Sequence, residues 1–152
     1  QLLPRAWEST PLRVFSFLEM IGITSRRPPL LVLQEALDKM EALATHRSRL
    51  GLSPHAPYST VPELLRLTAT AARRRRCAVT VHLAESAAEF EMFVQGAGDM
   101  FTWLQRSGRD MSDCGRVSPV RVTMSSAAGS GSGSAGASGA RAASKAVARV
   151  LS

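Results

Sequence analysis

Two short stretches, GLSPHAPYST at residues 51–60 and VHLAES at residues 81–86, decide the fold of this chain. Each places a histidine where an apolar strand gives way to a loop, and one amphipathic helix is predicted between them. A strand, a helix and a strand in this order form two parallel strands joined by a crossover helix. His55 and His82 are therefore expected at the same carboxyl-terminal edge of a sheet, where α/β proteins build active sites.

The same alternation covers the chain on both sides of these motifs. Residues 12–23 form an almost continuous apolar run, which predicts a strand buried on both faces. Residues 30–49 repeat apolar side chains at helical spacing, and residues 50–53 and 78–83 are short apolar segments that predict two further strands. Strands that alternate with helices indicate an α/β fold with a parallel sheet, either open or closed into a barrel.

Capping patterns predict where two helices begin. Thr60 with Glu63 fits a capping box and predicts a helix over residues 61–75, with Pro62 tolerated in its first turn. Ser86 with Glu89 fits a second capping box and predicts a helix through Phe93 that Gly96 and Gly98 terminate. Both helices therefore start directly after a histidine motif.

Charge and composition change sharply along the chain of 152 residues. Its net charge of +7 comes mostly from five basic residues after Asp113, where no acidic residue follows. The run Arg73–Arg76 ends a predicted helix, where cations complement the helix dipole, so we predict no nucleic-acid partner. Residues 125–140 contain only Ser, Ala and Gly, which predicts a disordered tail over residues 123–152 after a folded region at residues 1–122.

The sequence also bears on the compartment of the protein. No apolar stretch is long enough to span a bilayer, and no export signal is visible, so we predict no membrane partner and a cytoplasmic location. Cys77 and Cys114 are too few and too widely spaced for a zinc knuckle or a disulfide framework.

His82 and Glu85 are the first candidates for chemistry. A neutral imidazole can bind a divalent metal, and a carboxylate just beyond the strand can move protons between water and substrate. The same spacing also suits a purely structural pair. His55, between two prolines, fits either a loop-bracing hydrogen bond or a ligand, and Tyr58 fits either a packed ring or a substrate contact.

Taken together and in order, four segments resemble one enzyme family: LRVFSFLEMIG, GLSPHAPYSTVPELL, VHLAESAAEFEMF and GRVSPV. They are similar to the middle of metal-dependent enzymes of the amidohydrolase superfamily, in the aminohydrolase branch of guanine deaminase, S-adenosylhomocysteine deaminase and triazine hydrolases. The resemblance covers about residues 11–120. It implies a (β/α)8 TIM barrel, of which this chain would supply about strands 3 to 5 with their helices.

The resemblance also implies roles for five residues. His82 matches a histidine that binds a divalent metal, zinc or iron, and Glu85 matches the acid/base that follows it. His55 matches a histidine that faces the substrate, Tyr58 a second substrate contact, and Glu19 an acidic position that orients its neighbours. The implied substrate is a small cyclic amidine or a purine-, pyrimidine- or triazine-like ring whose C–N bond is hydrolysed, in an enzyme that can form a homo-oligomer.

Other expected ligands are missing from the sequence. The family's paired histidines on the first strand and its later histidine and aspartate have no counterpart here, and no histidine follows His82. Three predicted strands cannot close a barrel of eight. We therefore expect a fragment that is inactive as an isolated chain. The alternative is a non-catalytic α/β remnant, or an interaction module that needs a partner chain to cover its sheet edges.

Overall fold

Two parallel strands, β1 (Val14–Met20) and β2 (Ser48–Pro54), form the centre of the protein. The structure is a computed structural model that describes residues 9–23, 27–46, 48–116, 118–119 and 121. Val14 pairs with Ser48 and Met20 with Pro54, so both strands run the same way and end together. The strand–helix–strand order predicted from the sequence is confirmed for this pair.

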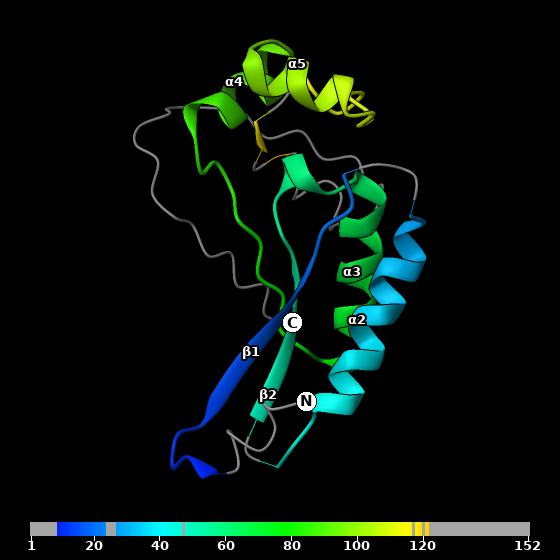
Figure 1. Ribbon diagram of the computed structural model, residues 1–152, viewed down its shortest axis with the longest axis vertical. Helices are drawn as coiled ribbons and strands as arrows, with labels where there is room; N and C mark the ends of the chain where they lie inside the picture. The colour runs from blue at the N-terminus through cyan, green and yellow to red at the C-terminus, as the bar shows by residue number, and fades with distance from the viewer. Residues whose placement is uncertain (1–8, 24–26, 47, 117, 120, 122–152) are drawn as a thin grey trace.

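Two helices, α2 (Pro29–Leu43) and α3 (Pro62–Arg75), lie side by side and cover one face of the strand pair (Figure 1). The core lies between these layers and consists of seven buried side chains: Met20, Val32, Leu33, Ala36, Leu37, Leu52 and Leu64. Leu52 and Leu64 are completely buried, and burial of each leucine stabilises the fold by about 1.5–3 kcal/mol. Because Met20 of β1 and Leu52 of β2 belong to this core, it holds the carboxyl-terminal ends of both strands in place.

The other face of β1 is open. Side chains along β1 alternate between partly covered and exposed positions, and Phe15 and Phe17 are 48% and 40% exposed. The prediction of a strand buried on both faces is therefore wrong for the described residues. The exposed side chains of Phe15, Phe17 and Glu19 share one face of β1, opposite the face that the helices cover.

Helix α2 ends at Leu43, six residues before its predicted end. Thr45 and Ser48 explain the early stop, because each side chain hydroxyl accepts a hydrogen bond from the backbone N–H of the other residue, at 3.1 and 3.0 Å. Such local bonds compete with the helical pattern. The strand β2 consequently starts at Ser48, two residues earlier than predicted.

The predicted capping box of α3 is absent. Its N-cap is Val61, which makes no side-chain capping bond, and the Thr60 hydroxyl donates to the carbonyl of Ala56 at 2.8 Å instead. The bounds of the helix are nevertheless close to the predicted ones. Pro62 starts the first turn, and Arg76 ends the helix with φ 52° and an N–H bonded to the last carbonyls.

The third predicted strand, residues 78–83, forms only an isolated parallel bridge from Val79 to Leu52. Leu52 donates to Ala78 and accepts from Thr80, both at 3.0 Å. The next residue of β2 that faces this segment is Pro54, which has no N–H to continue the ladder. The prediction of a full strand is therefore wrong, although the segment runs beside β2.

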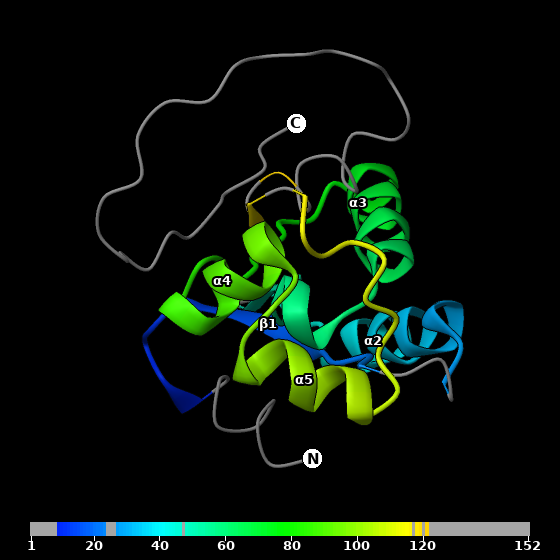
Figure 2. The same ribbon diagram turned by 90° about the horizontal axis from the view of Figure 1, so that it is seen from above.

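A separate lobe lies over the carboxyl ends of the strands (Figures 1 and 2). It consists of α4 (Ala87–Gln95) and α5 (Asp99–Arg106), which pack around Met92, Phe93, Leu104 and Cys114. The N-cap Ser86 and the C-cap Gly96, with φ 66°, confirm the predicted ends of α4. Helix α5 was not predicted from the sequence.

These elements bear out the predicted α/β class with parallel strands, while they do not form a complete barrel. The predicted tail at residues 123–152 lies outside the described residues. None of the helices in the described ranges is both long and apolar enough to cross a membrane.

Candidate metal centre

Three of the predicted site residues lie together at the carboxyl ends of the strands. Glu19 is next to the last residue of β1, His55 follows β2, and His82 lies in the extended segment beside it. One ligand atom from each side chain lies within 4.8 Å of the other two. The centre is formed by residues that are 27 to 63 positions apart in the sequence, and parallel strand pairing brings them to one edge.

Backbone bonds fix His55 on both sides. Its N–H donates to the carbonyl of Met20 at 3.0 Å, and its carbonyl accepts from the N–H of His82 at 2.8 Å. Its ring contacts the Ser59 hydroxyl through Nδ1 at 2.6 Å. Because Nδ1 is used in this way, a ligand in the centre would bind Nε2.

A tight turn brings Glu85 back to His82. Ala84, between the two residues in the turn, has φ 53°, which lies in the left-handed region that a residue with a Cβ seldom adopts. The Glu85 carboxylate lies 3.1 Å from Nδ1 of His82. A carboxylate on Nδ1 orients an imidazole so that Nε2 can bind a metal, and strained backbone of this kind is concentrated at functional sites.

The ring of Tyr58 stands against His55, with their centroids 5.8 Å apart in an edge-to-face arrangement. Burial raises the pKa of the Tyr58 hydroxyl, and the negative charges of Glu85, Glu89 and Glu19 raise it further. The phenol therefore stays protonated at neutral pH. It can donate a hydrogen bond toward a molecule in the centre.

Glu89 lies beneath the centre and is fully buried. Its Oε2 accepts from the N–H of Glu85 at 2.8 Å, while its own N–H donates to the Ser86 hydroxyl at 3.1 Å. The predicted capping box is thus altered, because its carboxylate contacts Glu85 instead of the N-cap residue. Burial raises the pKa of Glu89, and its Oε1 is buried without a hydrogen-bond partner.

The chemistry of the donors suits a divalent metal of the first transition row. Two imidazoles and a carboxylate are typical ligands of zinc and of non-haem iron. His82 and Glu19 are exposed while His55 is partly buried, so the cluster is accessible to a small molecule. The structure brings together the five residues predicted for the site, with Tyr58 and Glu85 on either side of the two histidine rings, whose centroids are 5.1 Å apart.

The chain is similar in sequence to known deaminases. Over 88 residues the chain is 33% identical to the 5-methylthioadenosine/S-adenosylhomocysteine deaminase of Desulforamulus reducens, which is 57% of this chain and 20% of that protein. Over 65 residues it is 35% identical to the aminodeoxyfutalosine deaminase of Deinococcus radiodurans, which is 43% of this chain and 16% of that protein. The resemblance to the aminohydrolase branch of the amidohydrolase superfamily is confirmed for this segment. No protein-family model matches the chain.

Solved structures agree with this fold. The aminofutalosine deaminase of Helicobacter pylori superposes with a TM-score of 0.60, at 22% identity over 67% of this chain and 26% of that chain. Its complex with methylthio-coformycin gives a TM-score of 0.59 at 23% identity, over 67% of this chain and 25% of that one. The chain therefore spans about a fifth or less of the length of the curated relatives that it matches and about a quarter of the structural neighbours.

Sequence reasoning missed three residues that support the centre: Ser59, Glu89 as a contact of Glu85, and Arg109. Ser59 contacts His55 from four residues away, a distance that a turn between two prolines does not reveal. Arg109 lies 51 residues beyond Tyr58, whose carbonyl it contacts. No local pattern points to either contact.

Proposed function

We propose that this aminohydrolase segment provides part of the active site of a metal-dependent deaminase that hydrolyses a C–N bond of a purine-like ring. The grouping of Glu19, His55 and His82 at one strand edge is the observation that carries the proposal. The relatives are deaminase enzymes, and one structural neighbour is described with methylthio-coformycin. A purine nucleoside is the substrate class that these names support.

Each side chain has a proposed role that its surroundings support. His82 binds the metal through Nε2 while Glu85 contacts Nδ1. Glu85 also lies where a carboxylate can carry a proton between water and the leaving nitrogen, and Glu19 orients the neighbouring groups. His55 and the protonated Tyr58 contact the substrate ring.

Zinc or iron is the proposed cofactor, and His82 is its main ligand. His55 and Glu19, besides the roles given above, offer a second imidazole and a carboxylate, and this donor set fits either ion. When bound, the ion supplies Lewis acidity that makes water a better nucleophile at neutral pH. The described residues offer this one cluster of three candidate donors, so we expect weak metal binding and no turnover from them alone. The cytoplasmic location and homo-oligomer stay predictions.

The chain contains three histidines, which permits a test with an internal control. In a sample labelled with ¹⁵N-histidine, addition of Zn²⁺ is expected to shift the ring signals of His55 and His82. His46 is exposed at the opposite end of β2, so its signal should not move. His82→Gln should abolish the shift of His55, whereas His46→Gln should leave both site signals unchanged.

Two results would contradict the metal centre: equal shifts of all three rings, or none at millimolar Zn²⁺. Methylthio-coformycin added to the zinc-loaded sample tests the substrate class. It should shift the His55 ring and the resonances of Tyr58, the single tyrosine of the chain. Inosine, which lacks the amino group that a deaminase removes, is the control and should bind more weakly.

The open face of β1 supports a second candidate function. Leu12, Phe15, Phe17 and Ile21 are between 40% and 68% exposed, which is unusual for large apolar side chains on one strand and its flanks. A partner chain that covers this face would make the protein an interaction module. Light scattering on the purified chain distinguishes the two, because a stable monomer at high concentration would argue against a required partner.

A further inference from the structure

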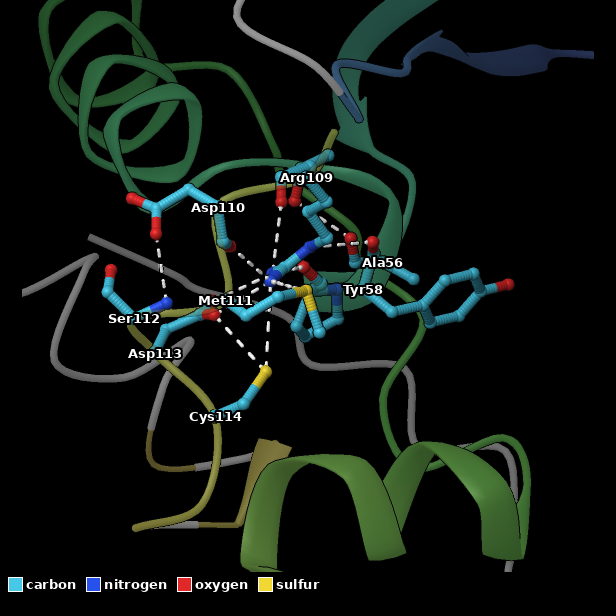
Figure 3. A network of polar contacts seen from close by, with 10 residues as sticks. Ala56, Tyr58, Arg109, Asp110, Met111, Ser112, Asp113 and Cys114 are labelled. Atoms are coloured by element: carbon cyan, nitrogen blue, oxygen red, sulfur yellow. Dashed lines mark hydrogen bonds and ion pairs between the residues drawn. The ribbon is translucent and has the colours of Figure 1, made fainter. Parts of the chain in front are cut away.

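The guanidinium of Arg109 is buried against the turn at residues 57–60, which carries Tyr58 and follows His55, and its side chain is 0% exposed (Figure 3). It donates to three main-chain carbonyls of that turn: Tyr58 at 3.0 Å, Pro57 at 2.9 Å and Thr60 at 3.4 Å. Its two terminal nitrogens, Nη1 and Nη2, also form a bidentate ion pair with Asp113, at 2.7 and 2.8 Å. One cation therefore joins the turn to the segment after α5.

These carbonyls need a donor from outside the turn. Within the 3-10 turn η1 (Pro57–Ser59), the N–H of Ser59 donates to the carbonyl of Ala56 at 3.1 Å. This bond does not use the carbonyls of Pro57, Tyr58 or Thr60. Buried carbonyls without a partner are costly, and the planar fork of Arg109 satisfies three of them at once. The Asp113 carboxylate neutralises the buried charge, and the ring of Phe93 lies 5.7 Å from the guanidinium.

The position of the turn at residues 57–60 determines how the side chains of His55 and Tyr58 are oriented in the site. Ser59 contacts Nδ1 of His55, and its carbonyl accepts from the N–H of Gly22 at 2.9 Å, just after β1. Figure 3 shows the ring of Tyr58 directed away from the guanidinium while its carbonyl points toward it. A change in the turn would therefore move Ser59 and Tyr58 together, and the ring of His55 with them.

We propose that Arg109 is a positioning residue, which holds the turn at residues 57–60 so that His55 and Tyr58 face the metal centre. The role in catalysis rests on the proposed function, but the hold on the turn does not. Lysine carries the same charge as a single flexible ammonium group, so it cannot contact three carbonyls and a carboxylate in one plane. Arg109→Lys thus separates the geometry of the fork from its charge.

Amide hydrogen exchange on the full chain tests the proposal directly. In Arg109→Lys, protection of the Ser59 and Gly22 amides is expected to fall at least tenfold, while amides within α2 keep their wild-type protection. The matched control is Arg106→Lys, because Arg106 is exposed at the end of α5 and should leave every amide unchanged. The Zn²⁺-induced shift of His55 in the labelled sample should weaken in parallel.

Two outcomes overturn the proposal: wild-type protection of Ser59 and Gly22 in Arg109→Lys, or an equal loss of protection in α2. If Arg109→Lys does not fold, Asp113→Asn decides by the same comparison, because it retains the arginine and removes the charge that orients it. Failure of the wild-type chain to bind Zn²⁺ would refute the proposed function only, since the exchange measurement requires no metal.

Discussion

Gly51 allows the segment that carries His82 to lie against β2, so Gly51→Ala is a sharp test of the fold around the site. An added Cβ would lie 2.7 Å from the carbonyl oxygen of Ala78 and 2.6 Å from the ring of Phe17. Phe17 is partly exposed and its ring can rotate, but Ala78 is main chain and accepts a bond from Leu52. Ordinary contact begins at about 3.4 Å, so the Ala78 backbone must move by about 0.7 Å.

Overpacking of this kind costs about 1–3 kcal/mol. Replacement of glycine by alanine also restricts the unfolded chain, which returns about 0.4–1 kcal/mol. We therefore expect Gly51→Ala to lower the free energy of unfolding by about 1–2 kcal/mol. With a typical urea m-value of about 1–3 kcal/mol/M, the unfolding midpoint would fall by roughly 0.5–1 M.

Gly22→Ala is the matched control, because its added Cβ would meet Leu64 at 3.4 Å, an ordinary contact. This variant should be neutral or slightly stabilised. Urea unfolding followed by far-UV circular dichroism measures both variants. Equal midpoints for Gly51→Ala and Gly22→Ala would refute the close approach of the Ala78 segment to β2. The position of His82, whose N–H bonds to His55 in this segment, would then need another explanation.

Three further predictions concern single side chains. Burial raises the folded-state pKa of Glu89, so its contribution to stability is present below the unfolded pKa and is lost as pH rises. In urea titrations Glu89→Gln should therefore gain stability relative to wild type as pH rises above about 4.5, and a stability difference that does not change with pH would contradict this. Ser59→Ala removes the contact to Nδ1 of His55, so the affinity for Co²⁺, measured by visible absorption, should fall about tenfold or more. Ser112 is exposed, so Ser112→Ala is the control and should keep the wild-type affinity. Burial and Asp113 raise the pKa of the Cys114 thiol to about 12, so iodoacetamide at pH 8 should modify Cys114 only after unfolding. Rapid labelling of Cys114 itself in the folded chain, distinguished from the partly buried Cys77 by peptide mapping, would refute its burial.

Local signals predicted the parts of the fold that depend on local physics. The bounds of α3 were predicted closely although the Thr60–Glu63 capping box used to place its start is absent, and the N-cap Ser86 and the C-cap Gly96 of α4 were predicted correctly. The strand–helix–strand order placed His55 and His82 at one edge without any knowledge of their contacts. Such signals depend on neighbouring residues, which a sequence shows directly.

The features that were missed depend on residues far apart in the sequence. Arg109 contacts carbonyls 49 to 52 residues away, and main-chain acceptors leave no trace in the identity of those residues. The helix α5 follows a glycine N-cap without a side-chain bond, so it lacks the usual start signal. The open face of β1 was also missed, because an apolar run does not reveal which of its faces is covered.

Pro54 connects the wrong prediction of a full strand at residues 78–83 with the arrangement of the site. A regular parallel ladder beyond Leu52 would use the N–H and carbonyl of residue 54 toward the segment at residues 78–83. Because proline has no N–H, the ladder stops, and the N–H of His82 bonds to the carbonyl of His55 instead. This bond ties the main chains of the two histidines together and leaves their rings 5.1 Å apart. The break in the ladder at Pro54, which makes the strand prediction wrong, is therefore also the reason that the main chains of His55 and His82 are bonded to each other.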